Sequence, residues 1–167
     1  AEYQLNDRWS VNGGLRYTDE EKDYSDGSFY EPLIPGFYYV QNISEDYALD
    51  SHWSGSLALN WHPDATSLVY VKYSRGFKSG GFYGGIPFSK EEISPYSEET
   101  INAYELGFRK VFDEYNLNFN GALFSYDYRD VQGFIRRSNP LTGTAIDLLG
   151  NQGSASHLGA EVSLSWM

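Results

Sequence analysis

Cysteine is absent from the 167 residues, and 12 basic side chains face 23 acidic ones, which gives a formal net charge of -11. Without thiols, neither a disulfide framework nor a thiolate metal site can form. Nucleic acid is excluded as a partner, because phosphate binding needs a positive surface. Long apolar runs are also missing, and no segment approaches the roughly 20 residues of a membrane-spanning helix. Cations and neutral molecules remain as possible ligands.

Aromatic residues and glycine are abundant instead. Phe, Trp and Tyr make up 17% of the chain, with 15 Tyr beside 17 Gly, at a mean hydropathy of -0.50. Low mean hydropathy does not exclude insertion into a membrane, because a transmembrane β-strand needs only about 9–11 residues and turns only alternate ones toward lipid. The order of the apolar residues is therefore more informative than their number.

Apolar and polar residues alternate along several segments, as in β-strands with one apolar face. Between Trp53 and Trp61, for example, odd positions are mostly apolar and even positions are small or polar. No long segment keeps the 3.6-residue period of a helix. We therefore expect an all-β chain with about six full strands and a short strand at residues 1–5. The full strands are expected at residues 8–24, 48–62, 66–78, 98–112, 115–136 and 152–166.

The connections between these segments alternate in length. Tight turns are expected at Asn6-Asp7, Pro63-Asp64 and Asp113-Glu114, and long loops at about 25–49, 79–97 and 137–151. This arrangement predicts an antiparallel up-and-down meander with two unlike ends, which is typical of outer-membrane barrels. Aromatic residues beside the tight turns suit an interfacial girdle; they are Trp9, Trp61, Tyr115 and Trp166.

The polar faces of the strands carry charged residues that would be costly inside a small dry barrel. We expect them to face a large lumen; they are Arg16, Lys72, Glu105, Arg109 and Glu161. About six strands are too few to close a barrel, because bacterial single-chain barrels start at eight. The sequence therefore predicts one partial barrel domain over residues 1–167, a slice of a larger barrel wall.

Four ordered motifs, which begin at Trp9, Leu68, Tyr104 and Asn151, resemble segments of one family, the TonB-dependent outer-membrane receptors. "LVYVKYSRGFKSGGF" is similar to a strand and loop entry of that family, and "YELGFRKVFDEYNLNFNGALFSYDYRDVQ" resembles its next hairpin. "NQGSASHLGAEVSLSW" and "WSVNGGLRYTDEEKDY" resemble the following and the preceding strands. The resemblance covers nearly all of the chain outside the long loops.

The resemblance implies a 22-stranded barrel whose lumen holds a plug domain. It implies gated import of a scarce ligand such as an iron-siderophore complex, haem, cobalamin or an oligosaccharide, in the outer membrane of a Gram-negative bacterium. The implied partners are the remaining barrel strands and plug, the inner-membrane TonB complex through the plug, membrane lipid, lipopolysaccharide and a small-molecule ligand. Arg75 and Lys78 would lie near the outer interface, within reach of lipopolysaccharide phosphates.

Aromatic residues in the long loops are the candidate ligand contacts. They are Phe37, Tyr38, Tyr39, Phe82 and Tyr83, which would present flat faces to a sugar ring or an aryl siderophore. The alternative is that these rings pack the loops against one another.

No catalytic, metal or cofactor site is predicted. His52 and His157 are expected toward the long-loop end and His62 beside a tight turn, so a site made of all three histidines is not expected. Neither Gly-x-Ser-x-Gly nor His-Glu-x-x-His occurs. Two other functions stay open. One is a soluble carbohydrate-binding module, in which the Trp and Leu faces would be buried against a second sheet of the chain. The other is a structural outer-membrane component of an assembly.

Overall fold

The computed structural model describes residues 1–25, 44–48, 51–83, 95–138, 143 and 145–166. Regular structure in these ranges is almost entirely β, and the helical element η2 (Asp113–Tyr115) is a single 3-10 turn. No helix in the described ranges has the length and apolar character needed to cross a membrane. The strands are β1 (Glu2–Asn6), β2 (Trp9–Thr18), β3 (Glu21–Ser25), β4 (Ser44–Ala48), β5 (His52–Trp61), β6 (Ser67–Lys78), β7 (Gly81–Phe82), β8 (Pro95–Tyr96), β9 (Glu99–Phe112), β10 (Leu117–Arg129), β11 (Gln132–Ser138), β12 (Ala145–Asn151) and β13 (Ala155–Trp166).

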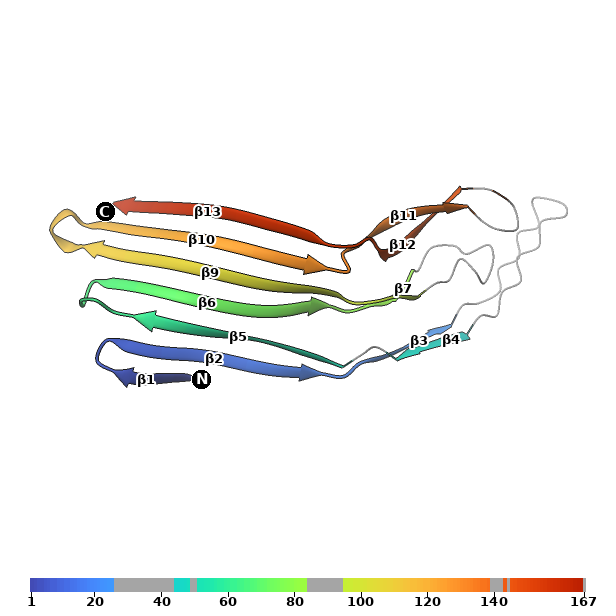
Figure 1. The fold of residues 1–167 in the computed structure, drawn as a ribbon, viewed down its shortest axis with the longest axis horizontal. Coiled ribbons are helices and arrows are strands. Elements are labelled where there is room, and N and C mark those ends of the chain that lie inside the picture. The colour runs from blue at the N-terminus through green and yellow to red at the C-terminus, as the bar shows by residue number, and fades with distance from the viewer. Residues whose placement is uncertain (26–43, 49–50, 84–94, 139–142, 144, 167) are drawn as a thin grey trace.

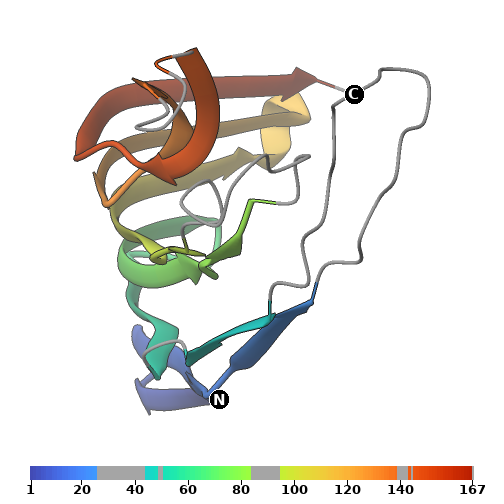
Figure 2. The same cartoon turned by 90° about the vertical axis from the view of Figure 1, so that its right-hand side faces the viewer.

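Seven strands form one antiparallel sheet in the order β1-β2-β5-β6-β9-β10-β13 (Figure 1). Strands that neighbour each other in the sheet follow one another along the chain, apart from the short strands of the long connections. Figure 2 shows that this sheet is curved rather than flat. The predicted all-β, antiparallel up-and-down meander is therefore confirmed.

Side-chain hydrogen bonds hold the short turns at one end of the sheet. The Oδ1 atom of Asn6 accepts hydrogen bonds from the backbone N–H groups of Arg8 at 2.9 Å and Trp9 at 3.1 Å. Between β5 and β6, Asp64 Oδ1 accepts from the Thr66 N–H at 2.9 Å, and Lys110 Nζ lies 3.1 Å from the same carboxylate. Short polar side chains that close their own turns in this way favour tight hairpins.

Two-stranded ribbons extend the sheet at the opposite end, where the sequence indicated irregular loops at about 25–49, 79–97 and 137–151. The ribbons are β3–β4, β7–β8 and β11–β12, and they lie together at one end of the sheet (Figure 1). The expectations of one strand over 8–24 and of one over 115–136 were also wrong, because β2 ends at Thr18 and β10 ends at Arg129. Asp130 has a φ of 54° and separates β10 from β11, because a left-handed residue cannot continue a strand.

The two faces of the sheet differ in exposure. One face, here called the outer face, carries large apolar side chains in the open, such as Leu57 at 58% and Val162 at 67% exposed. The inner face is mainly polar and is closely packed in places, where Ser10 and Ala58 are only 1% and 8% exposed. Among the described residues the buried hydrophobic side chains are only Ala58 and Leu148. The apolar face is thus not covered by a second sheet of the described chain, which contradicts the soluble-module hypothesis.

Aromatic side chains mark both ends of the outer face. Trp9 and Trp61 stack near the short turns with ring centroids 5.9 Å apart. Near the ribbons, Tyr17 packs on Trp53 at 5.1 Å. Trp9 and Tyr17 are separated by about 26 Å of strand at roughly 3.3 Å per residue, which is comparable with an outer-membrane apolar band about 25 Å tall. The sequence indicated the aromatic level beside the turns, and the structure adds a second level beside the ribbons.

Candidate functional site

The register between β6 and β9 brings polar residues together on the inner face. Lys72 lies directly opposite Glu105, and Tyr70 lies opposite Gly107. The Tyr70 hydroxyl donates a short hydrogen bond to Glu105 Oε1. The structure thus gives Glu105 a tyrosine partner on the neighbouring strand.

Two inner-face glycines make room for aromatic rings on neighbouring strands. A Cβ atom placed on Gly107 would lie 2.1 Å from Cζ of Tyr70, and one on Gly159 would lie 2.3 Å from Cζ of Phe124. Each ring therefore lies flat across the neighbouring strand, where any larger residue would displace it. This packing fixes the position of the Tyr70 hydroxyl and, through it, the Glu105 carboxylate.

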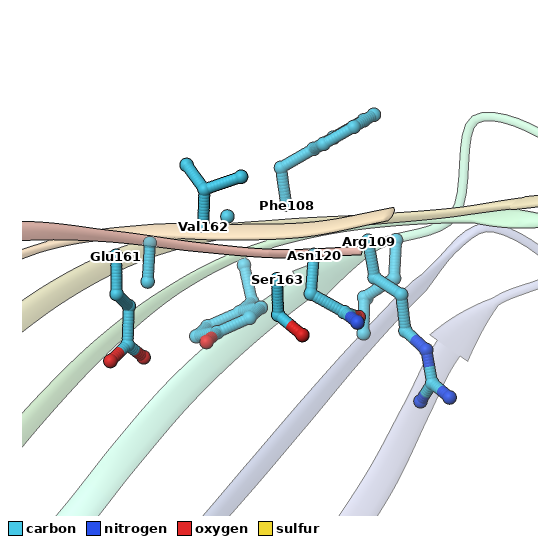
Figure 3. Close-up of a pocket in the computed structure, with 10 residues that line it drawn as sticks. Phe108, Arg109, Asn120, Glu161, Val162 and Ser163 are labelled. Atoms are coloured by element: carbon cyan, nitrogen blue, oxygen red, sulfur yellow. The ribbon is translucent and has the colours of Figure 1, made fainter. Parts of the chain in front are cut away.

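A hollow of about 430 Å³ lies beside this cluster on the inner face, where β6, β9, β10 and β13 meet. Figure 3 shows Arg109, Asn120, Glu161 and Ser163 on one side of the sheet, while Phe108 points to the other. Neither Arg109 nor Glu161 has an ion-pair partner among the residues that the structure describes. The hollow therefore offers both signs of charge to whatever fills the space inside the curve of the sheet.

Four of the five charged residues predicted to face a lumen come together. Lys72, Glu105, Arg109 and Glu161 lie on β6, β9 and β13, which with β10 form four consecutive strands of the sheet. Arg16 is separate, because it lies on β2 opposite Ser54 of β5. Sequence alternation found the face of each residue, but their grouping depends on strand register.

The predicted ligand aromatics divide into two groups. Phe37, Tyr38 and Tyr39 lie outside the described residues. Phe82 packs against Tyr24 of β3 with ring centroids 5.3 Å apart, and Tyr83 meets Phe134 of β11 edge-on at 5.9 Å. Both rings therefore link neighbouring ribbons, as expected if loop aromatics pack on one another.

A hydrogen-bond cluster at the base of the ribbons, here called the rim clamp, was not anticipated from the sequence. Gln132 Nε2 donates to the carbonyl oxygens of Ser79 and Ser97, each at 3.0 Å, and Asn151 Nδ2 also donates to the Ser97 carbonyl at 3.0 Å. The Gln132 N–H donates to Glu99 Oε2 at 2.8 Å. The rim clamp thereby joins the base of β11–β12 to the base of β7–β8. Gln132 ends one of the quoted motifs and Asn151 begins another, but nothing in the sequence indicates that they meet, because the members of the rim clamp are far apart in the chain.

Lys22 extends this contact to the third ribbon. Its Nζ donates to Ser79 Oγ at 2.8 Å and to the Gly80 carbonyl at 2.7 Å, and it lies 3.3 Å from Glu20. The Ser79 hydroxyl, and then Lys22, lower the pKa of Glu20 below its usual value. On the β11–β12 ribbon, Arg136 binds Asp147 through two hydrogen bonds of 2.8 and 2.9 Å, which lower the pKa of that carboxyl.

The histidines do not gather into a site. His52 Nε2 lies 3.0 Å from Glu98 Oε1, whereas His62 follows β5 at the short-turn end and His157 belongs to β13. No group of three metal-binding side chains occurs among the described residues.

Comparison with known proteins agrees with this geometry. The whole chain, residues 1–167, matches the family model for the β-barrel of TonB-dependent receptors. No curated protein matches the sequence.

Three solved structures share the fold. The ferric yersiniabactin uptake receptor FyuA from Yersinia pestis has a TM-score of 0.72 and 22% identity, and the match covers 99% of this chain and 22% of that one. The ferric-catecholate import receptor Fiu from E. coli K12 gives 0.60 and 17%, covering 98% of this chain and 24% of that one. The copper transporter OprC gives 0.65 and 15%, covering 99% of this chain and 25% of that one.

The chain thus spans about a quarter of the length of these matched structures. The family is one of outer-membrane receptors and not of enzymes. The antiparallel meander of this chain, the two unlike ends of its sheet and its apolar outer face all fit the wall of an outer-membrane receptor barrel. This chain belongs to the TonB-dependent receptor family, as part of the transmembrane β-barrel in the outer membrane.

Proposed function

We propose that this barrel segment is part of a receptor that binds and imports a scarce ligand such as an iron-siderophore complex. The observation that carries the proposal is the two-sided sheet. Its apolar face is exposed where lipid would lie, its polar charged face lines the inside of the curve, and its three ribbons gather at one end. Two of the three structural relatives described above are named as uptake or import receptors for ferric ligands.

The charged inner face would hold the plug domain that the family implies. Lys72, Arg109 and Glu161 have no ion-pair partners among the described residues, so their charges are available to a domain placed in the lumen. That domain would in turn contact the inner-membrane TonB complex. Opposite charges that meet in a partly desolvated interface set orientation and specificity.

The ribbon end would collect the ligand. Phe82 and Tyr83 are half-buried between ribbons, so each keeps part of its ring open, and Phe37, Tyr38 and Tyr39 are proposed as further contacts. Aromatic faces of this kind suit stacking on aryl or sugar groups.

Growth on single iron sources tests the proposal. A strain lacking the gene for this receptor should fail to grow when one ferric siderophore is the sole iron source, and the intact gene should restore growth. Unchanged growth on every ferric chelate would contradict iron import. A growth defect that occurs only when copper is limiting would instead indicate that the receptor imports copper, the metal transported by the structural relative OprC. Loss of outer-membrane integrity on all media would favour the structural component of an assembly.

A double change of the ribbon aromatics tests the ligand contacts. Phe82→Ala with Tyr83→Ala should weaken binding of the imported chelate about tenfold or more, because the few residues that dominate a binding interface cost about 2 kcal/mol or more on truncation, and aromatic residues are enriched among them. Tyr115→Ala is the matched control, since Tyr115 is an exposed aromatic at the short-turn end. Equal affinity in both variants would assign Phe82 and Tyr83 to loop packing alone.

A further inference from the structure

A polar zone lies on the outer face just beyond the aromatic pair Tyr73 and Tyr104, whose ring centroids are 5.2 Å apart. Alternation along β6 places Arg75 on the same face as Val71 and Tyr73, and alternation along β10 places Arg129 on the same face as Leu123. Both arginines are exposed. The lipid-facing surface therefore changes from aromatic to cationic at this level.

The register brings the two arginines near each other. Arg75 lies opposite Asn102 of β9, Asn102 lies opposite Asp127 of β10, and Arg129 follows Asp127 by two residues. Two strand spacings separate β6 from β10, which is about 10 Å. Long guanidinium side chains can converge over such a distance on one anionic group.

The donors of this zone are only partly used within the protein. Arg75 has no hydrogen-bond or ion-pair partner among the described residues. Arg129 makes one long contact of 3.4 Å to Asp127 and is 67% exposed. The Tyr73 hydroxyl donates to Asn102 Oδ1 at 2.7 Å, while the Asn102 amide nitrogen has no partner in the described ranges. Unused guanidinium and amide donors therefore face the membrane border.

The position argues for a lipid rather than a soluble occupant. An arginine on the lipid side of a barrel is costly at the bilayer midplane and costs little near the interface. Aromatic side chains next to the zone mark that interface. Guanidinium groups bind phosphate through paired hydrogen bonds.

We infer that Arg75 and Arg129, with Asn102 between them, form a binding site for the phosphorylated headgroup of lipopolysaccharide on the outer face of the barrel. Lys78, which the sequence grouped with Arg75, has the parity of Lys72 and belongs to the other face of β6. Arg129, and not Lys78, is therefore the second basic residue that lies with Arg75 on the outer face. The site is independent of the ligand that the receptor imports.

Lipid retention by the detergent-purified full-length receptor tests the inference. Native mass spectrometry should detect bound lipid A, and chemically dephosphorylated lipid A should bind at least tenfold more weakly. Arg75→Gln and Arg129→Gln should each weaken lipid A binding about tenfold, the effect of one charge-assisted hydrogen bond. Arg8→Gln, at the opposite membrane border, should retain full binding.

Three results would overturn the inference. The first is that dephosphorylated lipid A binds as tightly as intact lipid A. The second is that Arg8→Gln weakens binding as much as Arg75→Gln or Arg129→Gln does. The third is that free inorganic pyrophosphate, at the same concentration as lipid A, displaces the lipid. The comparison of the two lipids uses the unaltered receptor, so it decides the question even if a glutamine variant fails to insert. Arg75→Lys, which keeps the charge but loses the paired donors, should weaken the binding less than Arg75→Gln does.

Discussion

Gly107 shows how one inner-face residue controls its neighbours. Gly107→Ala would place a methyl group 2.1 Å from the present position of Tyr70 Cζ, so the ring must shift and its hydrogen bond to Glu105 is disturbed. Overpacking of this kind costs about 1–3 kcal/mol. We expect that loss in the free energy of unfolding, measured by denaturant titration in detergent micelles.

Gly14→Ala is the matched control for this change. Gly14 also lies on the inner face, but an added Cβ there would meet nothing within 4 Å. The control should be neutral or slightly stabilising, because alanine restricts the unfolded chain more than glycine does. If the two variants unfold at the same denaturant concentration, the tight packing of Tyr70 on Gly107 is wrong.

Asp64 gives a prediction about pH at the short-turn end. Hydrogen bonds from Thr66, Lys110 and Ser67 hold the pKa of its carboxyl well below the usual value. Because the pKa is lower in the folded state, the carboxylate stabilises the fold above the unfolded pKa of about 3.9. This contribution is lost as the pH falls through the folded value. The stability difference between the native chain and Asp64→Asn should be constant from pH 8 to about 5 and should shrink below about pH 4.

Salt separates this effect from general acid unfolding. High salt screens the ion pair between Lys110 and Asp64. It should therefore reduce the stability difference between the native chain and Asp64→Asn at pH 7 only in part, because the hydrogen bonds from Thr66 to Asp64 remain. A difference that grows on acidification would contradict the lowered pKa.

At the scale of the elements, the rim clamp makes neighbouring ribbons depend on each other. Gln132→Ala removes the donor to the Ser79 and Ser97 carbonyls, so backbone hydrogen exchange should increase both in β11–β12 and around residues 95–98. Gln152→Ala is the control, because Gln152 Nε2 donates to the Phe134 carbonyl inside its own ribbon. An increase confined to residues 132–151 in both variants would show that the ribbons open independently.

The elements also show what the sequence could predict. Alternation from Trp53 to Trp61 located β5 and its two faces, because a strand with one lipid-facing side has a period of two. The break at Asp130 was not predicted, since only a small share of aspartates adopt the left-handed region and nothing in the sequence singles out this one. The contact of Tyr70 with Glu105 was not predicted either, because 35 residues separate them and strand register decides their meeting.

At the scale of the whole molecule, the sheet lacks a core of its own. Leu57, Leu106 and Leu158 are 58%, 47% and 87% exposed, and in the described ranges only Ala58 and Leu148 are buried hydrophobic residues. Burying one such leucine away from water stabilises a fold by about 1.5–3 kcal/mol. In this sheet, lipid or detergent must bury these side chains. We therefore expect circular dichroism of the purified chain to show β-structure in detergent and not in plain buffer.

A pair of lysine substitutions sharpens this test, because neighbouring positions of β5 face opposite sides. Leu57→Lys puts a charge on the outer face, where it costs roughly 2–4 kcal/mol near the bilayer midplane, so the yield of folded protein in detergent should fall. Ser56→Lys puts the same charge on the polar inner face, opposite Gly14 and Ser74, and should leave the yield nearly unchanged. A folded monomer in plain buffer, or equal yields from the two variants, would contradict the assignment of the outer face to lipid.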